Sequence, residues 1–324
     1  MNFTEFNQTD FCLQFHCPER SVSTAVYVLL YVSAAAVVLL TVCGNLLIII
    51  SVCHFKQLHT PTNMLILSLA VSDFLVGVFV IPIAIMWMIE SCWIFNRVFC
   101  ICFMLSSYVL TSTSIYNIAL IAVDRYFALS NPFLYTKAVS VNTMCFVVLG
   151  DWFVLLIYNI ALQYFSGTLK NIVTCPGDCF LLLNEAWSLV DLLFTFVFPL
   201  TVIIILYALV FIIAKKHATA IRELNAQSSK NATGSKSERK AAKVLGILVS
   251  VFLVCLFPYF IYSLLGNVTE IEVESFQKLL VLVYLNSTIN PVIYALFYPW
   301  FRRCVKLVLT FQIFRTDSAL TKVL

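Results

Sequence analysis

Charged residues are scarce in this chain of 324 residues. Only 11% of the residues are Asp, Glu, Lys or Arg, whereas 61% are hydrophobic, and the mean hydropathy is +0.97. Soluble globular domains carry about 25% charged residues, so this composition excludes a soluble globular domain. The chain is therefore predicted to be a membrane protein.

Motifs that indicate an enzyme or a metal cofactor are also absent. The sequence has no phosphate-binding glycine loop, no zinc-ligand spacing and no HExxH motif. It has only four histidines, and all lie in predicted polar segments: His16, His54, His59 and His217. No internal repeat of the kind found in transporters is visible. We predict no enzyme activity and no resident cofactor, and a transporter or channel remains a disfavoured alternative.

Seven apolar windows are long enough to cross a bilayer. About 20 residues of helix cross roughly 30 Å of hydrocarbon, and only helices satisfy every backbone group at that length. The windows are 25–53, 62–88, 98–123, 142–164, 187–214, 244–265 and 275–297. They predict an all-α membrane protein with a seven-helix bundle over residues 25–298. Residues 1–24 are acidic and lack a signal-peptide pattern, so we expect a tail followed by a first helix that acts as the targeting signal.

Lysine and arginine counts predict the orientation of the bundle. Sixteen of the 20 basic residues fall in one set of connecting segments, and four fall in the other: Arg20, Arg97, Lys170 and Lys278. Because cytoplasmic loops are enriched in basic residues, the N-terminus is expected outside and the polar loop at about 215–240 inside. The net charge of +4 therefore reflects cytoplasmic loops, and no nucleic-acid partner is predicted.

Cysteines and glycosylation triplets offer a second indication of the outer face. Six of the 12 cysteines lie on the predicted outer side, and three disulfides among them allow fifteen pairings: Cys12, Cys17, Cys92, Cys100, Cys175 and Cys179. Glycosylation triplets begin on the same side at Asn2, Asn7 and Asn267. A further triplet at Asn231, on the inner side, is expected to be a chance match.

Polar residues inside the predicted helices form a pattern with one motif per helix. In chain order they are Asn45, Asp73, Asp124-Arg125-Tyr126, Trp152, Pro199 with Tyr207, Pro258, and Asn290-Pro291 with Tyr294. This series resembles the rhodopsin-like, or class A, G protein-coupled receptors over nearly the whole chain. The resemblance implies a plasma-membrane receptor with a heterotrimeric G protein as partner, and a short amphipathic eighth helix with a cytoplasmic tail at 299–324.

Three stretches narrow this resemblance to the trace amine-associated receptors. They are HFKQLHTPTN (54–63), SERKAAKVLGI (237–247) and YLNSTINPVIYALFYPWF (284–301). The resemblance implies a chemosensory receptor for small-molecule amines that signals through a stimulatory G protein to cyclic AMP. An opsin is disfavoured because no lysine that could hold retinal lies between Lys278 and Lys306.

The family resemblance assigns roles to further residues. An allosteric sodium ion would lie among Asp73, Ser114, Asn45, Asn286 and Asn290. Arg125 would pair with Glu238 at rest, and Ile115, Pro199 and Phe252 match the packed trio that links the ligand to helix 6. The usual Cys-Trp-x-Pro of helix 6 reads Cys255-Leu256-Phe257-Pro258 here, so Phe257 or Phe260 would take part of the indole's task. The G protein would touch the helix ends near Ala214 and Arg239 and the loop 131–137.

The resemblance also implies disulfides between Cys100 and Cys179, Cys12 and Cys175, and Cys17 and Cys92. The remaining cysteines within the helices are expected to be small apolar filling: Cys43, Cys53, Cys102, Cys145 and Cys255. Cys304, which lies beside basic residues, is either filling or a palmitoylation site.

One departure from the family bears on the ligand. Amine receptors of this type bind the ammonium with a helix 3 aspartate seven residues after the cysteine, where this chain has Ser107. The inward stripe persists without its charge: Ser107, Thr111, Ser114, Ile118, Ile121 and Arg125. Asp191 in helix 5 lies eight residues before Pro199, roughly 12 Å toward the outside, which is pocket depth. We expect Asp191 to bind the ammonium, with the amine reversed relative to the usual pose.

Aromatic residues would complete this pocket. Tyr259, Phe260 and Tyr284 match ligand-facing positions of the family, and with Ser107 and Thr111 they would surround an amine. The alternative for Asp191 is a bond to a neighbouring helix or a protonated state. A structural or protonated state is the favoured interpretation of Asp151, and Glu90, Asp178 and Glu185 are expected to be solvated or to attract cations.

Two other ligand classes stay open. A conventional aminergic neurotransmitter receptor would share the generic motifs but would carry an acid at position 107. A receptor for a non-amine ligand would explain Ser107 and make Asp191 incidental.

Overall fold

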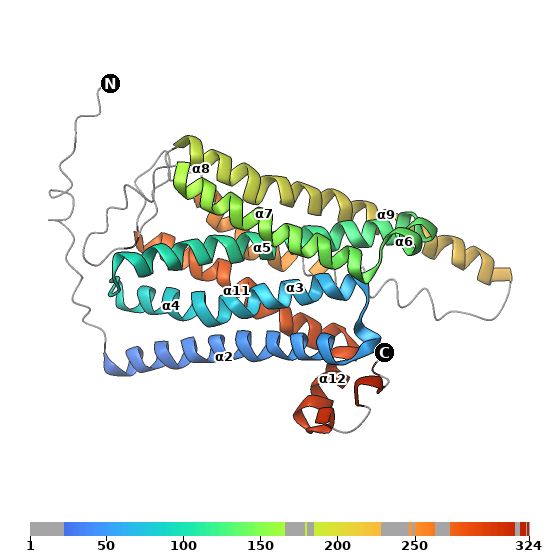
Figure 1. The fold of residues 1–324 in the computed structure, drawn as a ribbon, viewed down its shortest axis with the longest axis horizontal. Helices are drawn as coiled ribbons and strands as arrows, with labels where there is room; N and C mark the ends of the chain where they lie inside the picture. The colour runs from blue at the N-terminus through green and yellow to red at the C-terminus, as the bar shows by residue number, and fades with distance from the viewer. Residues whose placement is uncertain are drawn as a thin grey trace.

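The computed structural model describes residues 23–165, 179, 185–227, 246–247, 250–262, 273–314, 318–321 and 323. Every regular element in these ranges is a helix. The long helices lie side by side along the long dimension of the molecule (Figure 1). The predicted all-α membrane bundle is confirmed.

The elements of the bundle follow the predicted windows. They are α2 (Thr24–His54), α3 (Pro61–Leu75), the π-helical η2 (Val76–Val80), α4 (Ile81–Glu90), α5 (Arg97–Ser130), α7 (Val141–Phe165), α8 (Glu185–Asp191), the π-helical η3 (Leu192–Val197), α9 (Phe198–Gln227), the helix Ser250–Tyr262 and α11 (Val273–Phe297). Short elements are η1 (Lys56–Leu58), α6 (Pro132–Ala138), α12 (Pro299–Leu309), η4 (Gln312–Phe314) and η5 (Ser318–Leu320).

Six stretches of the described residues are long and apolar enough to cross a bilayer. They are Thr24–His54, Pro61–Glu90, Arg97–Ser130, Val141–Phe165, Ala186–Ile213 and Lys278–Phe297. The seventh predicted window, 244–265, is described over the shorter apolar helix Ser250–Tyr262. α5 and α9 continue beyond their apolar windows toward polar residues at one end of the bundle.

Local signals explain where several helices begin. The Oδ1 atom of Asn96 accepts the backbone N–H of Phe99 at 2.9 Å and caps α5. The hydroxyl of Thr60 accepts the N–H of Asn63 at 3.3 Å and caps α3. Pro61 follows that cap, where the missing proline N–H costs nothing.

Two crossing helices contain a π-helical turn just before a proline. η2 precedes Pro82 and η3 precedes Pro199. Because proline has no N–H, the helix loses a donor at each site, and the turn widens. In η3 the N–H of Phe198 bonds to the carbonyl of Leu193, five residues back. The resulting bulge comes directly after Asp191.

Small residues allow α2 to approach its neighbours closely. A Cβ atom placed on Gly44 would lie 2.7 Å from the Cβ of Pro291 in α11, and one on Gly77 would lie 2.9 Å from the Cγ2 of Thr41. The hydroxyls of Thr41 and Thr288 also hydrogen bond to each other at 2.7 Å. These contacts join the first crossing to the second and to the last, as small residues do in membrane bundles.

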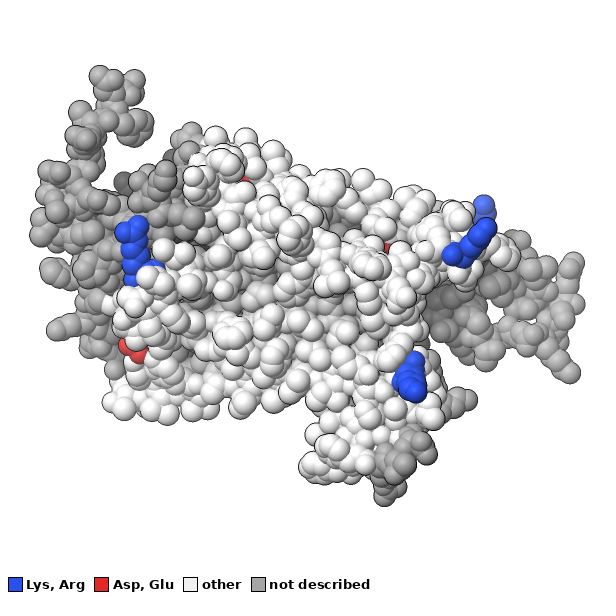
Figure 2. Space-filling model, viewed as in Figure 1, with Lys and Arg blue, Asp and Glu red and all other residues white. Residues whose placement is uncertain are grey.

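Charge is concentrated at the two ends of the bundle. Lys and Arg lie at the ends of the long axis, and the face between them is nearly free of charge (Figure 2). Large apolar side chains cover the outer surface, including Phe146 at 75% exposure and Phe153 at 64%. Such a surface fits lipid rather than water.

The last helix, α12, turns away from the bundle axis (Figure 1). It buries Trp300, Phe301 and Cys304 and exposes Arg302 and Arg303, so it is amphipathic as expected.

The residues after α12 return to the loop that follows α2. Ser318 and the Nε2 atom of His54 share a hydrogen bond at 2.9 Å. The N–H of Val323 donates to the Oε1 atom of Gln57 at 3.1 Å. This part of the tail therefore packs on the first loop at the same end of the bundle.

Candidate functional site

Asp191 is the last residue of α8 and lies directly before the bulge. Its Oδ1 atom accepts the hydroxyl of Thr195 at 2.6 Å and the hydroxyl of Tyr158, from α7, at 3.2 Å. Both donors use the same carboxylate oxygen. The bond to Tyr158 is a contact with a neighbouring helix, which was the alternative expectation for Asp191. This bond uses the Oδ1 atom only.

Tyrosine side chains from three further elements line the region around this carboxylate. Tyr108 in α5 and Tyr259 in the helix Ser250–Tyr262 lie near Asp191, and the hydroxyls of these two tyrosines lie close to each other. Tyr284 in α11 interacts with Ser107 in α5. The candidate site is therefore polar toward α5, carries the Asp191 carboxylate on the α8 side and is lined by aromatic rings.

Phe260 packs against the bulge η3 rather than lining the polar site. Its ring stacks on Phe196 of η3 with centroids 3.7 Å apart and planes 14° apart. Both rings are buried. Of the three aromatic residues expected in the pocket, Tyr259 and Tyr284 lie near the polar groups, and Phe260 packs against η3.

A small cavity lies between the expected ligand residues and the expected sodium residues. Its volume is about 10 Å³, close to what one water molecule needs. It is lined by Val76, Thr111, Ser114, Ile115, Leu256, Val283, Tyr284, Asn286 and Ser287. Thr111 and Tyr284 belong to the ligand set, whereas Ser114 and Asn286 belong to the sodium set, so the cavity connects the two.

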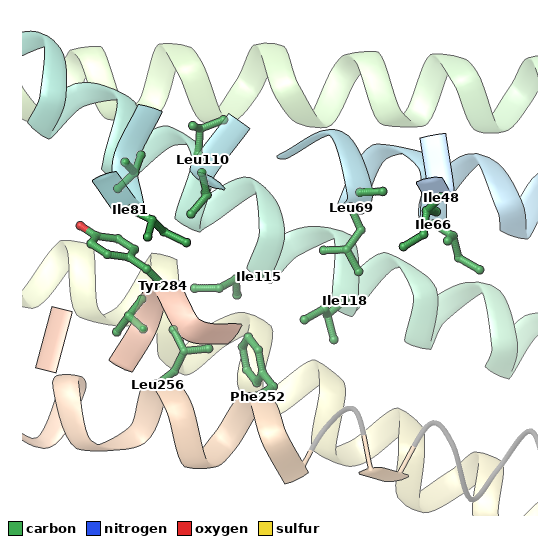
Figure 3. Close-up of a cluster of buried hydrophobic side chains, with 14 of the residues drawn as sticks. Ile48, Ile66, Leu69, Ile81, Leu110, Ile115, Ile118, Phe252, Leu256 and Tyr284 are labelled. Carbon is green, nitrogen blue, oxygen red and sulfur yellow. The ribbon is translucent and has the colours of Figure 1, made fainter. Parts of the chain in front are cut away.

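The packed trio lies beside this cavity. Ile115 of α5 and Phe252 are fully buried and point toward each other, with Leu256 and Tyr284 alongside (Figure 3). Pro199 is buried as well. Leu256, which stands where the family has tryptophan, is buried, whereas Phe257 is 51% exposed. Phe257 therefore faces outward, and of the two expected substitutes for the indole only Phe260 is buried.

Asp73 is fully buried and accepts three hydrogen bonds. Ser287 donates to Oδ1 at 2.7 Å, Ser114 donates to Oδ1 at 3.2 Å, and Asn290 donates to Oδ2 at 2.7 Å. Asn45 instead donates to the carbonyls of Thr41 and Ser287. Asn286 lines the cavity. Carboxylate and hydroxyl oxygens are present for a sodium ion, and side-chain donors from α5 and α11 bind the carboxylate directly.

At the opposite end of α5, Asp124 and Arg125 form an ion pair at 2.5 Å. Asp124 also accepts the hydroxyls of Thr62 at 2.7 Å and of Tyr135, in α6, at 2.6 Å. Burial, and next the bond to Asp124, raise the pKa of the Tyr135 hydroxyl. Arg125 donates to Thr62. Its expected partner, Glu238, lies outside the described residues.

The other expected activation residues lie near this end. The hydroxyls of Tyr207 and Tyr294 are buried and make no hydrogen bond within the described part of the chain. Tyr126 is half-buried on α5. Pro291 lies inside α11.

Cys100 and Cys179 form a disulfide with Cα atoms 5.7 Å apart. Cys92 is also disulfide-bonded. The expected partners Cys12, Cys17 and Cys175 lie outside the described residues, as do the glycosylation triplets at Asn2, Asn7 and Asn267. The disulfide at Cys100 fixes the start of α5, which carries Ser107 and Tyr108.

Some expectations for cysteines are wrong. Cys43, Cys53 and Cys102 are exposed on the outer surface of the bundle, so they are not core filling; Cys145 is partly buried and Cys255 buried. Cys304 is buried against the surrounding side chains, with Ser51 among its neighbours. Burial raises the pKa of its thiol to about 11. Cys304 therefore fits the filling interpretation rather than palmitoylation, since acylation needs an accessible thiol.

The expectation of a solvated Glu90 is also wrong. Glu90 ends α4, and its Oε1 atom accepts the hydroxyls of Tyr27 and Tyr31 from α2. It is half-buried. These bonds join the start of α2 to the end of α4.

Asp151 lies on α7, partly buried in the span next to Trp152. The indole N–H of Trp152 donates to the hydroxyl of Ser68 at 2.9 Å. The Oδ2 atom of Asp151 is buried and makes no hydrogen bond among the described residues. Neither of the two hydroxyls that bind Asp191 belongs to a residue bonded to Asp151 among the described residues.

Several site residues have little signal in the sequence. Thr195 lies four residues after Asp191 on the same helix face, so the spacing predicts a contact between these two side chains. Tyr108, Tyr158 and Ser287 lie in apolar runs, where tyrosine and serine are common packing residues. Only the packing of helices far apart in the sequence brings them to the two aspartates.

The sequence is similar to known receptors over most of its length. Residues 44–294 match the family described as 7 transmembrane receptor (rhodopsin family). Similarity is 38% identity over 278 residues to Trace amine-associated receptor 13c of Danio rerio, covering 83% of this chain and 82% of that protein. It is 38% over 320 residues to Trace amine-associated receptor 6 of Rattus norvegicus, covering 94% and 91%. It is 38% over 290 residues to Trace amine-associated receptor 7e of Mus musculus, covering 83% and 79%.

Proposed function

This chain belongs to the trace amine-associated receptors of the rhodopsin family, and on that basis we propose that it binds amines through Asp191 and signals through a G protein. The main support is the Asp191 carboxylate, whose Oδ1 atom accepts two hydroxyl hydrogen bonds. Tyrosine side chains lie around it. The Oδ2 atom is the oxygen that receives the ammonium. No acid stands at position 107 to compete for it.

Energetics support a cation at this position. A carboxylate at bilayer depth costs about 2.5 to 3.5 kcal/mol on insertion scales. The two hydroxyl bonds offset part of that cost, and a charge-assisted bond to an ammonium contributes about 1.5 to 3 kcal/mol. Rings of Tyr108, Tyr259 and Tyr284 add cation–π attraction. The amine enters with its nitrogen toward α9 and its body toward α5, the reverse of the family's usual pose.

The output of the receptor is a rise in cyclic AMP through a stimulatory G protein. Outward movement of the sixth crossing helix, which includes Ser250–Tyr262, breaks the contact between Arg125 and Glu238. The cytoplasmic end of the bundle then binds the G protein. Phe133 of α6 is 91% exposed at that end, which suits a partner surface. The receptor lies in the plasma membrane with its N-terminus outside, and its use is chemosensory.

The test compares amines with matched non-amines on cells that express the full chain. Butylamine, dimethylbutylamine and cadaverine are applied beside butanal and butanoic acid, and cyclic AMP is measured together with receptor at the cell surface. Asp191→Asn keeps the shape of the side chain and removes its charge, so we expect the amine response to vanish while surface receptor persists. An unchanged dose response would exclude Asp191 as the ammonium partner.

A charge-relocation variant serves as the matched control. Asp191→Ser combined with Ser107→Asp exchanges the two side chains and places the acid where conventional amine receptors carry it. We expect the response to return with a different preference among the amines, because the ammonium now binds at α5. Activation by butanal or butanoic acid but by none of the amines would instead favour the non-amine receptor.

A further inference from the structure

The π-helical bulge η3, which precedes α9, leaves one backbone carbonyl without a donor from its own helix. In an α-helix the carbonyl of Phe194 would accept the N–H of Phe198, but that N–H bonds to Leu193. In the π register the donor would be residue 199, which is Pro199 and has no N–H. A backbone carbonyl in hydrocarbon needs a partner, so another element has to supply it.

Tyr116 of α5 supplies the missing donor. Its hydroxyl donates to the carbonyl of Phe194 at 2.9 Å. The ring centroids of Tyr116 and Phe194 lie 5.6 Å apart. The ring centroids of Tyr158 and Phe194 lie 4.1 Å apart. Phe194 therefore packs against two tyrosines, and one of them, Tyr158, also donates to Asp191.

Asp151 provides a second acceptor near the same hydroxyl. Asp151 lies on α7, which packs against α5, within electrostatic range of Tyr116. Its Oδ2 atom is buried and makes no hydrogen bond within the part of the chain that the structure describes. Tyr116 is thus bonded to the Phe194 carbonyl in η3, and Asp151 on the neighbouring helix α7 offers a second acceptor.

We propose that Tyr116 is a positioning residue for amine recognition, which fixes the bulge and so aims the Asp191 carboxylate, with Asp151 as its alternative acceptor. The inference rests on the proposed role of Asp191. If the bulge closed into a regular α-helix, the residues before it would turn by about 100° relative to those after it. Asp191 would then leave the tyrosines that line the site.

The two acceptors correspond to two positions of the bulge η3. In the structure Tyr116 bonds to the Phe194 carbonyl and holds the bulge against α5. When an ammonium binds Asp191 and the bulge shifts, the hydroxyl of Tyr116 turns to Asp151. The proton stays on the tyrosine oxygen throughout, and only the acceptor changes.

The experiment uses the full receptor in cells, with butylamine, dimethylbutylamine and cadaverine as probes and cyclic AMP and surface receptor as readouts. Tyr116→Phe removes the donor, and we expect the EC50 of the activating amine to rise about tenfold at unchanged surface receptor. Tyr116→Trp keeps an aromatic ring with an N–H donor, and we expect its EC50 to stay within about twofold of the unaltered chain.

Coupling to Asp151 is measured by a double-mutant cycle. Asp151→Val removes the alternative acceptor, and we expect the EC50 to rise about threefold in the unaltered chain and not further in Tyr116→Phe. Additive effects of the two substitutions overturn the role of Asp151 as an acceptor for Tyr116. If Tyr116→Phe does not reach the surface, Asp151→Val carries the test, and an unchanged EC50 overturns the proposal.

Other outcomes separate this inference from the proposed function. An EC50 of Tyr116→Phe equal to that of the unaltered chain overturns the inference and leaves amine binding at Asp191 intact. The same holds if Tyr116→Phe lowers only the melting temperature of the solubilised receptor, which is what a purely structural contact would do. No response of the unaltered chain to any amine overturns both.

Discussion

Two hydroxyls on one carboxylate oxygen define the direction from which a ligand reaches Asp191. A carboxylate oxygen accepts about two hydrogen bonds, and Oδ1 receives them from Thr195 and Tyr158. The Thr195 contact lies within α8 and η3, whereas Tyr158 comes from α7. Together they fix the carboxylate plane, so the ammonium meets one prepared oxygen rather than a rotating group.

Tyr158→Phe tests this orientation by deleting one hydroxyl and nothing else. Loss of one hydrogen bond costs about 1 kcal/mol, so we expect the EC50 for the activating amine to rise about fivefold. Tyr164→Phe removes a hydroxyl from the same helix at an exposed position and should leave the EC50 unchanged. If the two variants gave the same dose response in the cyclic AMP assay, orientation by Tyr158 would be refuted.

At the scale of elements, the contact between α2 and α11 depends on the absence of a side chain at Gly44. Pro291 occupies the space that a Cβ atom would need. Pro291 also precedes Tyr294 and follows Asn290, which binds Asp73. The approach of α2 therefore helps to hold the segment of α11 that carries the buried polar network.

Gly44→Ala is expected to disturb this contact. A methyl group 2.7 Å from the Pro291 Cβ forces the helices apart, and overpacking of this kind costs about 1 to 3 kcal/mol. We expect less receptor at the cell surface and a lower melting temperature after solubilisation. Gly150→Ala is the matched control, because nothing lies within 4 Å of the added methyl group. Equal surface levels for the two variants would count against close packing at Gly44.

The sequence predicts the crossing helices well because one physical requirement dominates them. The windows 62–88 and 142–164 correspond to Pro61–Glu90 and Val141–Phe165. The widened turns at η2 and η3 were not predicted, because a π-helical turn changes the register without changing composition.

The candidate site could be predicted only in part. Asp191 and Asp73 stand out because a carboxylate in an apolar run is rare. Tyr158 and Tyr116 do not stand out, since tyrosine is ordinary packing in such helices. The expectation that Cys43, Cys53 and Cys102 fill the interior was wrong for a related reason. The lipid-facing surface of a membrane bundle is as apolar as its core, so apolar character does not distinguish buried positions from lipid-facing ones.

In the part of the chain that the structure describes, the basic residues lie near the two ends of the bundle. α2 begins at one end, and α12 lies at the other (Figure 1). Arg97 and Lys278 start α5 and a stretch of α11 at the first end, whereas Lys56, Arg302 and Arg303 lie near the second. The described basic residues of the predicted inner segments, such as Lys56, Arg302 and Arg303, thus lie toward one end of the bundle. That distribution orients the chain during insertion.

Glycosylation reports this orientation on the whole receptor. If the end that holds the start of α2 faces outward, Asn2, Asn7 and Asn267 are accessible to the glycosylation machinery, whereas Asn231 in the inner loop is not. We expect glycosidase treatment to increase the gel mobility of the unaltered chain and to leave a variant with all three outer asparagines changed to Gln unaffected. Asn231→Gln is the control and should shift like the unaltered chain. A mobility shift that persisted in the triple variant and disappeared on Asn231→Gln would mean that the bundle is inserted the other way round.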